Sequence, residues 1–211
     1  MIKSFKKLGF SLLFCLPLFA FAAENFVAGK DYEVIGKENK SANKISVIEF
    51  FSYNCPWCAR IEPAIEAWAQ KQGSHIEFTR IPVIFHKDWL LSAKAYYTAN
   101  LLNMENKLNP LLFKAEQDKA NPLKTEEDMI QFFIKQGVEP TTARSAFESS
   151  TMMDLKIKEG MSQMSHYRVN GVPAFIINNQ FKTDVQMAGS EERLIQILNY
   201  LLSQAHMKKA A

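Results

Sequence analysis

Two cysteines near the start of the chain have the spacing of a redox-active pair. Cys55 and Cys58 enclose Pro56 and Trp57, and Pro56 suits the first position of a helix, where its missing N–H costs nothing. At a helix N-terminus the unpaired N–H groups and the helix dipole favour an anion, which lowers the pKa of a thiol and populates the reactive thiolate. We therefore expect a disulfide that exchanges with other thiols. A substrate thiolate would attack Cys55, while Cys58 would be the less exposed sulfur, one turn further along the helix.

A structural disulfide and a metal site are the alternative interpretations. A bridge between Cys55 and Cys58 closes so short a loop that it would stabilise the fold by only about 2 kcal/mol. Structural zinc takes a full set of Cys and His ligands, whereas the sequence has no second Cys pair and its histidines are scattered. The methionines between residues 152 and 164 would suit a soft metal, but Met more often fills gaps in a core. We expect no metal and no cofactor besides the Cys55–Cys58 disulfide itself.

The N-terminal segment indicates where this chemistry takes place. Residues 1–22 combine a basic start with an apolar run and end in Ala-Phe-Ala, which is typical of a secretory signal peptide cleaved after Ala22 or Ala23. The apolar run is shorter than the about 20 residues of a membrane-spanning helix. We therefore expect an exported protein in an oxidising compartment, where a pair of cysteines forms a disulfide.

Composition excludes several other classes of protein. Of the 211 residues, 47% are hydrophobic and 22% charged, which excludes a disordered chain, and a total of 3 cysteines excludes a disulfide-dense miniprotein. The signal segment carries three lysines, so the 25 basic residues fall to 22 in the mature chain, which has 22 acidic residues. This neutral balance gives no electrostatic reason to expect nucleic-acid binding.

The first part of the mature chain alternates strands with a helix. Runs of β-branched and aromatic residues predict a short edge strand at 31–35, a buried strand at 44–52 and another strand at 75–83. The helix that begins at Cys55 is expected to end at Gly73.

The middle of the chain is predicted to be helical. From Asp88 onward the apolar residues recur at helical spacing. Pro110 and Pro140 are each expected to start a helix, and Thr125 begins a segment that resembles a capping box. Strand character returns at 174–177, before an Asn-Asn turn, a partner strand from Phe181 and a last helix capped by Ser190.

This order of elements predicts an α/β fold in which helices cover a sheet and a helical segment interrupts it. After the signal peptide at 1–22, the α/β domain would comprise residues 23–87 and 162–211. The helical insertion would occupy residues 88–161.

The motifs together resemble a known family. The segment EFFS at 49–52 runs into CPWC at 55–58, and GVP follows far downstream at 171–173. With the helical insertion, these features resemble the DsbA-type periplasmic thiol:disulfide oxidoreductases of the thioredoxin superfamily, over essentially all of the mature chain. The resemblance implies a thioredoxin-like fold with an inserted helical domain.

The resemblance also implies roles for individual residues. Cys55 would be the nucleophile and Cys58 its buried partner. Pro173 would be a cis-proline that faces the cysteines, and Val172 would offer backbone hydrogen bonds to a bound peptide. Glu49 would be a buried acid that manages protons during exchange, although the residues around it are equally consistent with a carboxylate on a solvated face.

The family implies a direction of electron flow and two partners. The protein would donate its disulfide to reduced or unfolded proteins newly exported to the periplasm, and a quinone-linked membrane oxidase of the DsbB type would reoxidise it. A reductase or isomerase of the same fold and a client-binding chaperone without redox turnover are the alternatives.

Trp57 departs from the Pro-His dipeptide usual in this family. A histidine beside the thiolate can carry positive charge, whereas Trp57 cannot. One hypothesis is that Cys55 is less acidic and the protein a milder oxidant than the family norm. The other is that Trp57 adds apolar contact for unfolded clients.

Overall fold

The computed structural model describes residues 26–37 and 44–209. The predicted signal peptide at 1–22 therefore lies outside the described residues. Within these ranges, no helix has the length and apolar character needed to cross a membrane.

A five-stranded mixed sheet forms the centre of the fold, with strand order β1-β5-β4-β2-β3. Its strands are β1 (Glu33–Val34), β2 (Ile45–Phe51), β3 (Ile76–Pro82), β4 (Ala174–Ile177) and β5 (Phe181–Asp184). The central strand β2 pairs in parallel with β3 and antiparallel with β4. The early and late parts of the chain thus form one sheet, as expected for an α/β fold interrupted by an insertion.

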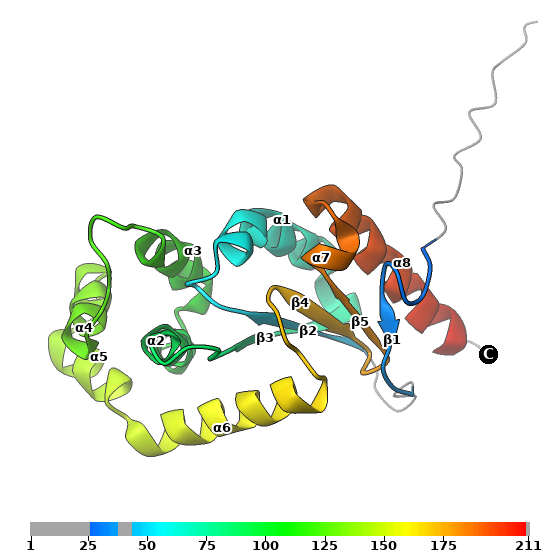
Figure 1. Cartoon of the computed structure of the whole chain (residues 1–211). Helices are drawn as coiled ribbons and strands as arrows, with labels where there is room; N and C mark the ends of the chain where they lie inside the picture. The colour runs from blue at the N-terminus through cyan, green and yellow to red at the C-terminus, as the bar shows by residue number, and fades with distance from the viewer. Residues whose placement is uncertain (1–25, 38–43, 210–211) are drawn as a thin grey trace, which may run out of the picture.

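Helices cover both faces of this sheet and also form the insertion (Figure 1). They are α1 (Pro56–Gln72), α2 (Trp89–Leu101), α3 (Glu105–Glu116), α4 (Glu126–Lys135), α5 (Pro140–Phe147), α6 (Ser150–His166), α7 (Val185–Ala188) and α8 (Glu191–Lys209), with a 3₁₀ turn at Gly73–His75. Helices α1 and α8 lie on one face of the sheet, and α6 runs along the other (Figure 1). Helices α3, α4 and α5 gather beyond one end of the sheet, so the α/β class and the helical insertion are both present.

The apolar side chains divide into clusters that tie the insertion to the sheet. One cluster joins Val47 and Phe175 of the sheet to Ile61 of α1 and Leu198 of α8. A second fills the insertion, and it includes both Cys55 and Cys58. The pair therefore lies where α1 meets the core of the helical insertion.

Several local predictions are confirmed by hydrogen bonds and backbone angles. Thr125 caps α4 in a capping box with Asp128, in which each side chain accepts a bond from the other residue's backbone N–H. Asn178 and Asn179 join β4 to β5 with φ of 52° and 57°. The loop comprises residues 178–180, and Gln180 N–H closes it by donating to Ile177 O at 3.0 Å. Asn tolerates the two consecutive positive φ angles better than most residues.

The predicted start of a helix at Pro110 is wrong. Helix α3 begins at Glu105, and Pro110 lies inside it. The backbone N–H of Leu108 donates to Met104 O at 2.9 Å, so the helix has formed before the proline that cannot donate a bond. Helix α6 runs on to His166, past residue 161, where the sequence suggested a boundary. The short helix α7 was not foreseen.

Gly160 allows α6 to pack closely against the rest of the fold. A Cβ atom there would lie 2.9 Å from Tyr97 Oη and 3.0 Å from Ile81 Cγ2. We expect Gly160→Leu to lower the free energy of unfolding by about 1–3 kcal/mol, because overpacking forces neighbouring side chains or the helix to move. Urea denaturation measures the change. Lys158→Leu, on the exposed side of the same helix, should change stability little, and equal losses for both variants would contradict this account.

Candidate active site

Cys55 occupies the residue immediately before α1. Its backbone is extended, and Pro56 takes the first helical position. The Cys55 N–H donates to Ser52 O, and Ala59 N–H donates to Cys55 O, both at 3.1 Å. These bonds fix the turn between β2 and α1, so that the Cys55 sulfur lies at the start of the helix.

The two sulfurs differ in environment although both are largely covered. Cys55 is 8% exposed and Cys58 is 0% exposed, and both are free thiols. The Cys58 thiol hydrogen-bonds to the Cys55 sulfur, which lowers the pKa of Cys55 to about 6; burial opposes this, and the backbone N–H groups of Cys58 and Trp57 assist it. Burial raises the pKa of Cys58 well above its ordinary value. At neutral pH the reduced pair is therefore a Cys55 thiolate beside a Cys58 thiol.

The segment before β4 faces the nucleophile position. The Val172–Pro173 peptide bond is cis. When protonated, Cys55 Sγ donates to Val172 O at 3.4 Å. A cleft of about 500 Å³ adjoins this contact and is lined by Trp57, Val172, Pro173 and the segment that carries Asp184. The predicted residues Val172 and Pro173 thus lie beside Cys55, next to a space open to a ligand.

Trp57 forms one wall of this cleft. Its side chain is 50% exposed, and the Arg60 guanidinium carbon lies 5.0 Å from the centre of its ring. This cation–π contact restricts an otherwise exposed aromatic side chain.

Glu49 is buried beneath the cysteine pair and belongs to a cluster of charges. It is 1% exposed, which excludes the solvated face. Arg80 lies opposite it on β3 and approaches Glu49 Oε2 with Nε at 2.9 Å. The same guanidinium reaches Glu62 Oε2 and Glu66 Oε2, each at 3.1 Å. One arginine therefore binds three carboxylates, two of them buried.

The cluster leaves exchangeable protons close to Cys58. Burial raises the pKa of Glu49 even though Arg80 opposes the shift. Burial likewise raises the pKa of Glu62 to about 7, with the charges of Glu49 and Glu66 adding to it against Arg80. The charge of Glu49 also contributes to the raised pKa of Cys58. Protonation of the acids and of the buried sulfur is therefore linked.

Sequence reasoning identified Glu49 but missed Arg80 and Glu62. Two signals were available. Arg80 alternates with Ile76 and Phe78 and so falls on the apolar side of its strand, where a buried arginine needs acidic partners. Glu62 follows Cys58 by one helical turn and therefore shares its face of α1.

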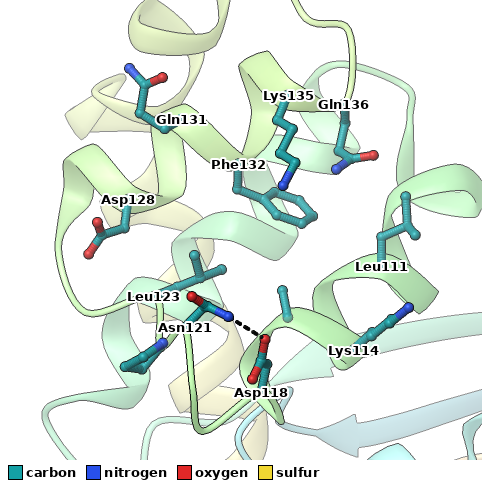
Figure 2. A pocket seen from close by; sticks show the side chains of 12 residues that line it. Leu111, Lys114, Asp118, Asn121, Leu123, Asp128, Gln131, Phe132, Lys135 and Gln136 are labelled. Carbon is teal, nitrogen blue, oxygen red and sulfur yellow. Dashed lines mark hydrogen bonds between the residues drawn. The ribbon is translucent and has the colours of Figure 1, made fainter.

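A larger hollow of about 810 Å³ lies on the helical insertion (Figure 2). Leu111 and Lys114 of α3 face Phe132 and Lys135 of α4 across it, and Asp118 hydrogen-bonds to Asn121 at its lower edge. None of its lining residues belongs to the cysteine pair or its neighbours. The hollow that adjoins the cysteine pair is therefore the smaller cleft of about 500 Å³. Among the residues described, no group of His, Cys, Asp and Glu is arranged to hold a metal ion.

Comparisons with known proteins agree on one family. The model of the DSBA-like thioredoxin domain matches residues 60–199. The thiol:disulfide interchange protein DsbA of Burkholderia cepacia is 34% identical over 211 residues, covering 97% of this chain and 99% of the relative. The protein of the same name from Pseudomonas syringae pv. tomato is 32% identical over 183 residues, covering 86% and 85%. The crystal structure of Pseudomonas aeruginosa DsbA superposes with a TM-score of 0.81 at 26% identity, covering 88% of this chain and 97% of that one.

We expect Arg80→Met to lower the free energy of unfolding of the reduced protein by about 3–5 kcal/mol near neutral pH, because Glu49 and Glu62 would be left buried without a counter-charge. Their pKa values would rise further. A raised pKa in the folded state stabilises the fold below the unfolded pKa, and this contribution is lost as pH rises through the folded pKa. The loss should therefore be smaller near pH 5. Urea unfolding at both pH values measures it.

Arg144→Met is the matched control. Arg144 also binds two carboxylates, of Glu127 and Glu148, but its side chain is 48% exposed, so its removal should have little effect. A small, pH-independent effect of Arg80→Met would contradict the importance of the buried charges.

Proposed function

This chain belongs to the DsbA-like thioredoxin family and is a thiol:disulfide oxidoreductase; we propose that it oxidises newly exported proteins by donating its Cys55–Cys58 disulfide. The observation that carries the proposal is the difference between the two thiols. Cys55, at the start of α1, has its pKa lowered to about 6 and is a thiolate above that pH, whereas Cys58 is buried with a raised pKa. Stabilising the reduced pair in this way makes the disulfide a stronger oxidant.

The exchange proceeds through a mixed disulfide. A client thiolate attacks Cys55 Sγ, the bond between Cys55 and Cys58 breaks, and Cys58 leaves with the electron pair and takes up a proton. A second client thiolate then attacks the client sulfur of the mixed disulfide. Cys55 leaves as a thiolate, and its pKa of about 6 makes it a good leaving group. The client has gained a disulfide, and two electrons have passed to the protein.

We propose that Glu49 manages the proton that Cys58 must gain or lose. The Glu49 carboxylate forms an ion pair with Arg80, and Arg80 also binds Glu62. Glu62 in turn lines a hollow of about 600 Å³ between α1 and α3, and its pKa of about 7 suits proton exchange at neutral pH. In this proposal Glu49 exchanges the proton with Cys58, and Glu62, which shares Arg80 with it, exchanges protons with the protein surface.

The cleft beside the cysteines is the proposed client site. The 3.4 Å contact between Cys55 Sγ and Val172 O supports this proposal, because a client backbone along Val172 and Pro173 would bring its own cysteine to the reactive sulfur. Trp57 adds an aromatic surface at the mouth of the cleft. A flexible client chain can contact the Val172–Pro173 backbone and the Trp57 ring without needing a deep pocket that fits one shape.

The proposed location is the periplasm, and the proposed electron acceptor is a quinone-linked membrane oxidase of the DsbB type. The signal-like segment at 1–22 and the full-length similarity to proteins named DsbA support export. Because the reduced pair is stabilised, it needs a more strongly oxidising partner to regenerate the disulfide. A reductase would run the same exchange in the other direction, and an isomerase would run it without net electron transfer. A chaperone would bind clients without any thiol exchange.

Serine variants at the two cysteines separate these functions. We expect Cys55→Ser to abolish oxidation of reduced ribonuclease, because no sulfur remains at the attacked position. Cys58→Ser should form a mixed disulfide with a glutathione-activated client peptide and retain it, because the resolving sulfur is missing. Mass spectrometry detects the adduct. Oxidation by Cys55→Ser would overturn the proposal, and unchanged suppression of client aggregation by that variant would reveal a separate holding activity.

The acidity of Cys55 is directly measurable. Thiolate absorbance of the reduced protein should titrate with a midpoint near 6, the value to which the pKa of Cys55 is lowered. A depressed pKa stabilises the reduced fold above the unfolded thiol's pKa, and this contribution is lost as pH falls through about 6. Trp57→His should lower the midpoint further by adding a charge beside the sulfur. An unchanged midpoint would reject the hypothesis that Trp57 limits the acidity of Cys55.

A further inference from the structure

Glu116, the last residue of α3, contacts the turn that carries the nucleophile. Asn54 Nδ2 donates to Glu116 Oε2 at 2.7 Å, and Asn54 is the residue directly before Cys55. The other carboxylate oxygen, Oε1, is buried and has no hydrogen-bond partner in the described part of the chain. A half-buried acid with one unsatisfied oxygen is costly to keep, and the exchange mechanism above does not use it.

Hydrogen bonds from α2 and from the end of α3 converge on the residues before Cys55. Ser92 Oγ, in α2, donates to Asn54 Oδ1 at 2.6 Å. Gln117 Nε2, next to Glu116, donates to Tyr53 O at 2.7 Å. The Asn54 backbone N–H donates to Ser52 Oγ at 3.2 Å. The insertion thus holds the turn from α2 and from the end of α3, while β2 and α1 fix its two ends.

We propose that Glu116 is a positioning residue for thiol exchange, which acts through its hydrogen bond to Asn54 on the turn that presents Cys55 at the start of α1. The inference rests on the proposed function, in which Cys55 is the attacked sulfur. The backbone N–H groups that stabilise the Cys55 thiolate belong to Trp57 and Cys58. Their distance from the sulfur depends on how firmly this turn is held.

The strength of this hold depends on the charge of Glu116. Burial raises the pKa of Glu116 to about 7; the bond from Asn54 opposes the shift, and the negative charge of Asp88 adds to it. Asp88 precedes α2 and is the charged neighbour in this balance, since Asn54 and Ser92 are uncharged. A carboxylate accepts a stronger hydrogen bond than a neutral acid does. The turn is therefore held more firmly above about pH 7 than below it.

The experiment compares the wild type with Glu116→Gln, which keeps the size of the side chain and an acceptor oxygen but cannot ionise. The rate of oxidation of a reduced dithiol peptide is measured for both from about pH 5 to about pH 8.5, a range that spans the raised carboxyl pKa. Ionisation of the peptide thiols affects both proteins equally and cancels in the ratio of rates. We expect this ratio, wild type over variant, to rise from near one to about fivefold, with a midpoint near pH 7.

Glu105→Gln is the matched control. Glu105 lies at the other end of α3, is also half-buried and also has a buried oxygen without a partner among the described residues. Within the described part of the chain, Glu105 makes no hydrogen bond or ion pair with the turn before Cys55, so its ratio should stay flat with pH. A rise equal to that of Glu116→Gln would show a general effect of charge on α3 and would overturn the proposal.

A double-mutant cycle with Asn54→Ala tests the route. If Glu116 acts through Asn54, adding Glu116→Gln to Asn54→Ala should cause no further pH-dependent change. A persistent effect would mean that the carboxylate acts on Cys55 through space and would overturn the positioning role. A flat ratio with an active wild type overturns this inference alone. A wild type that fails to oxidise the peptide overturns the proposed function instead.

Discussion

The chemistry of this protein depends on the different environments of two neighbouring sulfurs, which lower the pKa of one thiol and raise that of the other. Cys55 lies at the start of α1, where the Cys58 thiol and two backbone N–H groups stabilise a negative charge. Cys58 lies one turn further along and is completely buried. The free energy that favours the Cys55 thiolate is absent from the disulfide, so it favours reduction of the bridge. The sheet, the turn after β2 and the insertion together hold the two sulfurs in these different environments.

The proposed role of the charges near the pair is proton transfer, since they contribute little to the stability of the fold. A buried ion pair seldom stabilises a fold more than well-packed apolar side chains of similar volume would. Here one guanidinium serves three carboxylates, and burial still raises the pKa of Glu49 and Glu62. Such an arrangement retains protons near neutrality at a cost in stability. We propose that this loss of stability is tolerated because the buried Cys58 sulfur must gain and lose a proton in every cycle.

The sequence predicts features that depend on neighbours along the chain and misses those that depend on register. The buried strand at 45–51, the helix start at Cys55, the cap at Thr125 and the Asn-Asn turn all follow from local chemistry. Arg80 could be placed beside Glu49 only once the pairing of β2 with β3 was known. The helix start predicted at Pro110 was wrong because the helix already begins at Glu105, and a proline marks a helix start only where no earlier turn has formed. The cis bond before Pro173 came from family resemblance, since local sequence rarely distinguishes it.

The helical insertion is an integral part of the active site. Its apolar cluster includes both cysteines together with Leu108 and Phe113 of α3, so the insertion shares in the packed core in which Cys58 is buried. The end of the same helix holds the residues before Cys55 through Glu116 and Gln117. A thioredoxin-like sheet with α1 alone would place a helix N-terminus behind the sulfur but would leave the partner thiol and the preceding turn more exposed. The lowered pKa of Cys55 is set within the CPWC segment, by the Cys58 thiol and two backbone N–H groups. The raised pKa of Cys58 depends in addition on burial in the core that surrounds this segment.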